Sequence, residues 1–154
     1  DPSRGLGDVY KRQEYNVRMG DPECQTILPR LKTDFLKVIN TCLENNLDSI
    51  NLEWNEEKSI CIVLCAKGYP DKYENGIEIK RLNEIKLEKN NYIFHAGTKI
   101  KNSKVYSNGG RVLNFVMKSK NLKQSRDNLI KVIEDLNWEN GFFRKDIGFK
   151  IIEK

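Results

Sequence analysis

The chain has 154 residues, of which 38% are hydrophobic and 32% charged, and its formal net charge is +5. This length holds one ordinary domain or two partial ones, and the composition is that of a globular protein rather than a disordered tail. No apolar run approaches the ~20 residues that span a bilayer, so we expect no membrane partner. The positive charges are scattered among glutamates and include no base-reading motif, so an anionic substrate explains them as well as nucleic acid does.

The first predicted element is a β-strand over residues 14–19, which ends at the turn Gly20-Asp21-Pro22. Since residues two apart in a strand point to the same face, Glu14, Asn16 and Arg18 form one polar row. The two oxygen-bearing side chains suit a hard divalent cation, and the guanidinium suits a carboxylate or phosphoryl group beside it. By spacing alone, an ordinary amphipathic strand with its polar face in water is the better interpretation.

A helical region is predicted next, over residues 22–47. Asp21 suits the N-cap position, with Pro22 at the first helical position. Apolar residues recur at helical spacing between Leu28 and Cys42. Pro29 has no amide hydrogen to donate, so it should bend or interrupt the helix near residue 28.

From about residue 57 the pattern changes to short strands joined by polar turns, which predicts an antiparallel sheet. The predicted strands are residues 59–65, 77–80, 92–95, 104–107, 111–117 and 149–152. One helix is predicted over residues 122–136, with Asn121 as its N-cap and an apolar stripe that faces the core. The fold class is therefore α+β: a strand and a helix, followed by a small, mainly antiparallel β domain with one packed helix.

The cysteines and the single histidine do not indicate a metal site. The four cysteines include no C-x-x-C pair, and His95 is the only histidine, so zinc is not expected. Cys61 and Cys65 lie on one predicted strand roughly 13 Å apart, too far to form a disulfide with each other. We expect reduced thiols, and a hydrogen-bonded structural role for His95.

Five sequence blocks carry a resemblance to a known family. They are Glu14-Tyr-Asn-Val-Arg-Met-Gly-Asp-Pro-Glu-Cys-Gln25, Ala66-Lys-Gly-Tyr-Pro70, Phe94-His-Ala-Gly-Thr98, Ser107-Asn-Gly-Gly-Arg111 and Phe143-Arg-Lys-Asp-Ile-Gly148. In this order they resemble the phosphoribosylamine–glycine ligase (glycinamide ribonucleotide synthetase) family, ATP-grasp enzymes of de novo purine biosynthesis. Five blocks in the right order are far more specific than any one of them.

The resemblance implies roles for the first polar row. Glu14 and Asn16 match the family's ligands for Mg²⁺, or Mn²⁺, which bridges the phosphates of ATP. Arg18 matches a position that steadies the substrate carboxylate or the acyl phosphate made from it. Asp21 resembles the residue that receives the amine nucleophile, a role that competes with helix capping for the same oxygens.

The resemblance also suggests a phosphate site near the end of the chain. Arg144 and Lys145 would bind the 5-phosphate of phosphoribosylamine, because two adjacent cations of different geometry commonly grip a phosphate. The alternative, two solvated charges on the surface, has equal weight.

The family pattern divides the chain into three parts. Residues 1–13 do not match it and resemble translated vector sequence, so they are excluded from the fold prediction. Residues 14–55 correspond to the end of the ATP-grasp domain, and residues 56–154 to the carboxy-terminal domain. Most of the ATP site has no counterpart here, so we expect a carboxy-terminal fragment that is inactive alone.

The function implied by the resemblance is part of a cytoplasmic, ATP-dependent ligase. It joins glycine to 5-phosphoribosylamine through a glycyl phosphate, with ATP as co-substrate. The competing class is a basic α+β binding module for nucleic acid or protein, which leaves the pattern from Glu14 to Glu23 unexplained. The oligomeric state, and any fusion to other purine enzymes, stay open.

Overall fold

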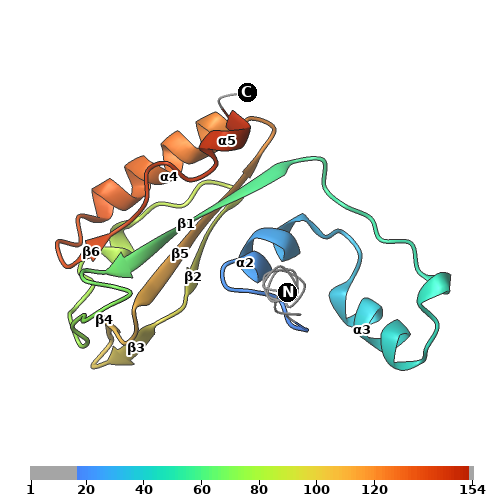
Figure 1. Cartoon of the computed structure of the whole chain (residues 1–154), viewed down its shortest axis with the longest axis horizontal. Helices are drawn as coiled ribbons and strands as arrows, with labels where there is room; N and C mark the ends of the chain where they lie inside the picture. The colour runs from blue at the N-terminus through green and yellow to red at the C-terminus, as the bar shows by residue number, and fades with distance from the viewer. Residues whose placement is uncertain (1–16, 153–154) are drawn as a thin grey trace, which may run out of the picture.

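The computed structural model describes residues 17–152, which form an antiparallel sheet with a helix on each face (Figure 1). The strand order in this sheet is β2-β5-β1-β6. Its strands are β1 (Lys58–Ala66), β2 (Asn91–His95), β5 (Arg111–Ser119) and β6 (Gly141–Phe142). The predicted α+β class is confirmed, and β1, β2 and β5 match three of the predicted strands within two residues at each end.

The two central strands, β1 and β5, form the longest pairing in the molecule, in antiparallel register from Lys58↔Ser119 to Leu64↔Leu113. Both are rich in β-branched and apolar residues, which favour a strand covered on both faces. Because side chains alternate along a strand, each strand supplies one row to each face of the sheet. The row facing the main core contains Ile60, Ile62, Leu64, Leu113, Phe115 and Met117.

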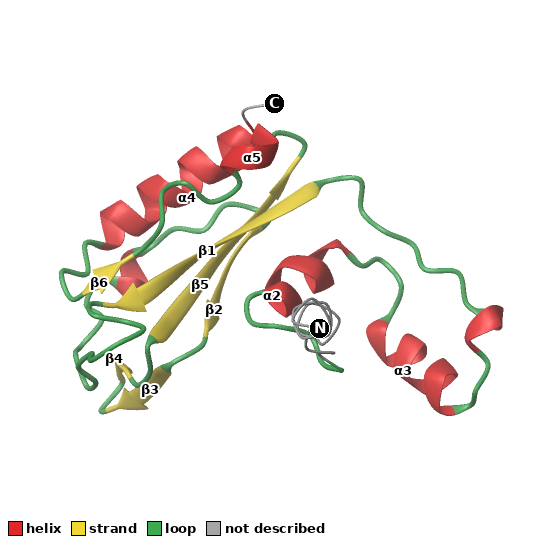
Figure 2. Ribbon diagram, viewed as in Figure 1, coloured by secondary structure: helices red, strands yellow, loops and turns green. Residues whose placement is uncertain are grey.

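Helix α4 (Leu122–Leu136) covers this apolar face (Figure 2). Its buried residues include Leu129, Ile133 and Leu136, which lie in one cluster with the apolar row of the sheet. The side chain of Asn121 accepts a hydrogen bond from the Gln124 amide at 3.1 Å, which confirms the predicted N-cap. None of the described helices has the length and hydrophobicity needed to cross a bilayer.

A separate two-stranded sheet, β3 (Thr98–Lys101) and β4 (Lys104–Ser107), projects beyond the main sheet. The sequence predicted β4 but not β3. Asn102 and Ser103 both have positive φ, the conformation of a two-residue hairpin turn. The predicted strand at residues 77–80 is wrong, since this segment forms only an isolated bridge between Glu78 and Tyr106.

The segment before β1 is less regular than predicted. It contains α2 (Glu23–Ile27), the 3₁₀ turns η1 (Leu28–Arg30) and η2 (Leu47–Ser49), and α3 (Phe35–Leu43). The helical region of residues 22–47 is thus divided, and η1 contains Pro29, where an interruption was predicted. Residues 17–19 form no strand; the rest of the predicted strand lies outside the described residues.

The last predicted strand is also wrong, because residues 149–152 form the short helix α5 (Phe149–Ile152). Gly148 has φ +79°, and its carbonyl accepts hydrogen bonds from the amides of Ile151 and Ile152. The edge of the sheet beside β1 is already occupied by β6. A short apolar run reads alike for strand and helix, so the tertiary context decides. A third 3₁₀ turn, η3 (Leu82–Glu84), precedes β2.

We expect Leu129→Ala to lower the free energy of unfolding by about 2–5 kcal/mol, because it leaves a cavity between α4 and the sheet. The Leu129 side chain is buried, and alanine keeps the helix propensity high. Urea denaturation measures the effect. Lys131→Ala, at an exposed position of the same helix, is the matched control and should change stability by less than about 0.5 kcal/mol. Equal effects of the two substitutions would contradict the described core.

Candidate functional site

The second face of the sheet carries polar side chains that the sequence analysis did not single out. Asn114 and Lys118 lie on β5 at same-face spacing, and both are buried. Helix α2 and η1 cover this face, opposite to α4 (Figure 1). Asn114 and Lys118 therefore lie between the sheet and the segment formed by α2 and η1.

A β-bulge brings Arg111 to this same face. The register of β1 and β5 shifts between Leu64 and Cys65, so that Cys65 pairs with Arg111. The extra residue, Val112, is fully buried in the apolar core. In regular register Val112 would face α2, and Arg111 would point to the opposite face. Bulges of this kind commonly redirect a side chain next to a functional site.

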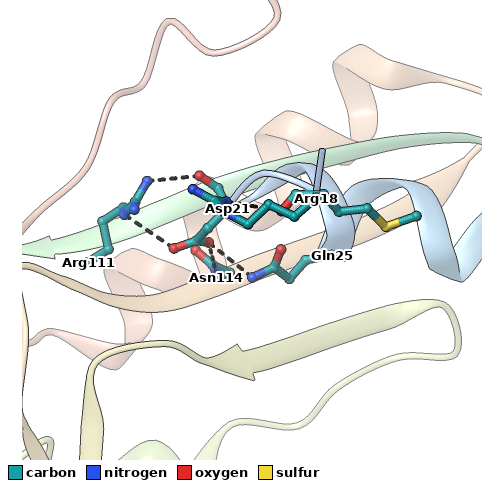
Figure 3. A network of polar contacts seen from close by, with 6 residues as sticks. Arg18, Asp21, Gln25, Arg111 and Asn114 are labelled. Carbon is teal, nitrogen blue, oxygen red and sulfur yellow. Dashed lines mark hydrogen bonds and ion pairs between the residues drawn. The ribbon is translucent and has the colours of Figure 1, made fainter. Parts of the chain in front are cut away.

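Asp21 is the centre of a network that we call the Asp21 junction, formed by Asp21, Gln25, Arg111 and Asn114 (Figure 3). Arg111 Nη1 donates to the Asp21 carbonyl at 2.8 Å, and Nε forms an ion pair with Oδ2 at 3.2 Å. Oδ1 accepts from Asn114 Nδ2 at 3.1 Å and from Gln25 Nε2 at 3.0 Å. The junction thus joins the start of α2 to the strand β5.

These contacts replace the capping role predicted for Asp21. The N-cap of α2 is Pro22, which makes no side-chain capping bond. The Asp21 carboxylate faces β5, where Arg111 forms an ion pair with Oδ2 and Asn114 donates a hydrogen bond to Oδ1. The predicted N-cap is therefore wrong at this helix, and the carboxylate serves contacts between distant parts of the chain.

Two amide oxygens in the junction have no hydrogen-bond donor among the described residues. They are Oδ1 of Asn114, whose side chain is fully buried, and Oε1 of Gln25. Each amide directs its NH₂ group to Asp21, so turning either amide over would bring an oxygen against the carboxylate. An unsatisfied buried acceptor costs about 1–3 kcal/mol. The carboxylate thus sets both orientations at a local cost in stability.

Arg18 lies beside the junction and is exposed (Figure 3). Its Nη1 donates to the carbonyl of Met19 at 3.3 Å. Glu14 and Asn16, the predicted cation ligands, lie outside the described residues. Residues 17–152 contain no group of three histidine, cysteine or acidic side chains that could hold a metal ion. The structure therefore brings together Arg18 and Asp21 of the predicted site.

Lys118 provides a second attachment of the same segment to β5. Its buried ammonium group donates to the Pro29 carbonyl at 2.8 Å and lies 3.9 Å from a carboxylate oxygen of Glu57. It also lies over the ring of Tyr92, 5.8 Å from the centroid. The chain from Asp21 to Pro29 is thus fixed to the sheet at both ends.

Arg144 and Lys145 lie away from the Asp21 junction. Arg144 forms a two-pronged ion pair with Asp146, at 2.9 and 2.6 Å, which lowers the pKa of that carboxyl group. Lys145 pairs with Glu134 of α4. Both cations therefore lie on the α4 side of the sheet, and Asp21 lies on the other side. As predicted for a structural histidine, His95 is hydrogen-bonded, to Thr98 at 2.9 Å.

Cys61 lies on the same face as the Asp21 junction, beneath α2. The pKa of its thiol is raised to about 12, mainly by burial and also by the nearby charge of Asp21, while a hydrogen bond with Thr26 opposes the shift. Burial also raises the pKa of Cys65, against the effect of Arg111. All four cysteines are free thiols.

Comparison with known proteins identifies the family. The profile of the family described as "Phosphoribosylglycinamide synthetase, C domain" matches residues 59–150. The chain belongs to this family. The match covers β1 to α5, and so includes Arg111 and Asn114 of the Asp21 junction.

Proteins named phosphoribosylamine–glycine ligase are similar to most of this chain. The phosphoribosylamine–glycine ligase of Fusobacterium nucleatum is 44% identical over 143 residues, which are 92% of this chain and 33% of that protein. The ligase of Caldanaerobacter subterraneus is 42% identical, over 88% of this chain and 32% of that protein. The crystal structure of phosphoribosylamine–glycine ligase from Thermotoga maritima matches with a TM-score of 0.60 and 31% identity, over 86% of this chain and 32% of that one. The chain spans about a third of the length of the relatives that it matches.

The family's carboxy-terminal domain thus contributes residues that the sequence prediction missed. A signal was present: Asn114 and Lys118 interrupt an otherwise apolar strand, four residues apart on one face. Such buried polar positions require partners. Arg111 could not be assigned to that face, because its direction depends on the bulge.

We expect Cys61 to be alkylated at least roughly 100-fold more slowly than the exposed Cys42 in the native protein at pH 8. A thiol of pKa about 12 is ionised to only about one part in ten thousand at that pH, and the thiolate is the species that reacts. Mass spectrometry after timed exposure to iodoacetamide measures both rates. In denaturing urea the two rates should converge. Equal rates in the native protein would contradict the burial of Cys61 under α2.

Proposed function

We propose that this chain works as the carboxy-terminal part of a phosphoribosylamine–glycine ligase. In this reaction ATP phosphorylates the glycine carboxylate to glycyl phosphate. The amine of 5-phosphoribosylamine then attacks the carbonyl carbon, a C–N bond forms, the C–O bond to phosphate breaks, and the amine loses a proton. The observation that carries the proposal is the match of most of the chain to a third of enzymes with this name. It favours the ligase over a basic binding module.

Arg18 and Asp21 are the residues for which the geometry gives most support. A guanidinium group suits the carboxylate of glycine or the acyl phosphate made from it, and Arg18 is exposed beside the junction. The Asp21 side chain is 33% exposed, and its Oδ2 forms an ion pair with Arg111 Nε. This oxygen retains room for one hydrogen bond from an amine. We assign Asp21 the role of orienting the nucleophile.

Glu14 and Asn16 complete this proposal as the ligands of Mg²⁺ or Mn²⁺. Their oxygen atoms are the ligand type that such cations prefer. When bound, the cation neutralises charge on the phosphates of ATP. The division of the chain at residues 55 and 56, and a location in the cytoplasm, belong to the same proposal.

The 5-phosphate role of Arg144 and Lys145 has less support from the geometry. Both cations pair with carboxylates on the α4 side of the sheet. One molecule of phosphoribosylamine would have to place its amine at Asp21 and its phosphate on the opposite side of the core. The role therefore stays a prediction from the family resemblance.

A chimera tests the proposed function. Residues 14–154 would replace the matching third of the Fusobacterium nucleatum ligase, which is 44% identical. We expect the chimera to release phosphate from ATP only when both glycine and phosphoribosylamine are present, because the two parts together rebuild the active site. The chain alone should show no turnover.

The control is Glu14→Gln in the same chimera, which should abolish the magnesium-dependent turnover and leave the melting temperature unchanged. A chimera that folds with the melting temperature of its parent and still lacks turnover would reject the ligase proposal. Full activity of Glu14→Gln at saturating magnesium would reject the metal role alone.

Arg144→Ala in the chimera tests the phosphate role. The resemblance predicts a raised apparent KM for phosphoribosylamine and an unchanged KM for ATP, because a phosphate contact would be lost. Steady-state kinetics with each substrate varied in turn measures both constants. An unchanged KM for phosphoribosylamine would assign Arg144 to its surface pair with Asp146.

A further inference from the structure

We propose that Arg111 and Asn114 are positioning residues for the ligase reaction: they hold Asp21, and with it the segment that carries Arg18, in place from the carboxy-terminal domain. This inference rests on the proposed function. It extends the active site from the segment of Arg18 and Asp21 to β5. Arg111, the first residue of β5, lies 90 residues after Asp21.

The contacts define both the position and the direction of Asp21. Arg111 binds the backbone carbonyl through Nη1 and the side chain through Nε, so one guanidinium group holds the main chain and the carboxylate together. Asn114 binds the other carboxylate oxygen. Two of these three contacts reach the carboxylate, one at each oxygen, and together they restrict its rotation. A group that must orient a nucleophile gains from such rigidity.

Arg111 is itself held by the surrounding structure. The bulge turns it toward α2, and its position is the first of β5. The preceding residue, Gly110, lies so close to the ring of Tyr69 that an added Cβ would come within 2.0 Å of a ring carbon. A larger residue at 110 would thus displace the loop or the strand start. The guanidinium therefore extends from a strand end whose preceding residue is closely packed.

Both amide groups of the junction direct their donors to Asp21. Turning either amide over would bring its oxygen against the carboxylate, so the two side chains have one favoured orientation. The carboxylate and its neighbours are thus arranged as one unit, which suits a group that must orient a nucleophile.

The position of Arg18 also depends on the contacts of Asp21. It lies three residues before Asp21, and no strand pairing holds residues 17–19. Loss of Arg111 would therefore loosen Asp21 and the turn that follows Arg18. The expected defect is in the chemical step and not in the binding of ATP.

The experiment compares Arg111→Gln, Arg111→Lys and Arg81→Gln in the chimera and in the full chain. Arg81 is the matched control, since it is an arginine in an exposed ion pair, with Glu84 at 3.0 Å. For Arg111→Gln we expect kcat to fall by about 10–100-fold, with the KM for ATP within about threefold of the unsubstituted chimera. Arg111→Lys keeps the charge but not the two-pronged contact. Its kcat should lie between that of the unsubstituted chimera and that of Arg111→Gln. Arg81→Gln should leave both constants unchanged.

A second measurement does not depend on activity. In the full chain, Arg111→Gln should raise the alkylation rate of Cys61 at least about tenfold, because the start of α2, above that thiol, loses its contacts with Arg111. Arg81→Gln should leave the rate unchanged.

The outcomes separate the two proposals. A kcat within twofold of the unsubstituted chimera, or a loss of kcat that only follows a loss of folded protein, would overturn the positioning role. If the unsubstituted chimera folds with the melting temperature of its parent and is inactive, the ligase proposal fails, and the alkylation rate then decides whether Arg111 holds Asp21 at all. An unchanged alkylation rate in Arg111→Gln would reject that contact.

Discussion

The antiparallel pairing of β1 with β5 is the interaction on which the rest of the structure depends. Two apolar strands of nine residues each expose two faces, and each face requires a cover. Helix α4 covers one face with a stripe of apolar side chains. The segment from Asp21 to Pro29 covers the other, where Asn114 and Lys118 make polar contacts beside the buried Cys61 and Val116. The same sheet therefore provides a hydrophobic core on one side and a mixed surface with buried polar contacts on the other.

The bulge between these strands links the fold to the site. One extra residue in β5 moves Val112 into the core and turns Arg111 to the face of α2. Packing and electrostatics are thus coupled, because Val112, which fills the core, and Arg111, which binds Asp21, are neighbours in the strand. A ligase built on this arrangement would use its carboxy-terminal domain as part of the active site and not only as a support.

The two groups of charged residues singled out in the sequence lie on opposite sides of the core. Arg18 and Asp21 lie on the α2 side, and Arg144 and Lys145 pair with carboxylates on the α4 side. The packed core lies between the two groups. This separation could not be read from the sequence, since Asp21 and Arg144 both belong to blocks that match the family. It follows only from which face of the sheet each segment covers.

The sequence by itself determined the elements whose signals are local. Apolar runs with β-branched residues identified β1 and β5, the stripe and cap of residues 121–136 identified α4, and Pro29 identified the interruption before α3. Short apolar segments carry no such signal, so residues 149–152 were assigned to a strand although the sheet edge was already occupied by β6. The family also came from local blocks of sequence.

The partners of Asp21 were decided by the tertiary structure alone. A carboxylate after a glycine reads as a helix cap, because its local donors are the only ones visible in the sequence. Arg111 and Asn114 lie 90 and 93 residues away, and they reach it through strand register and a bulge. Register is set by the burial of whole strand faces, a property of the assembled sheet that no single segment contains.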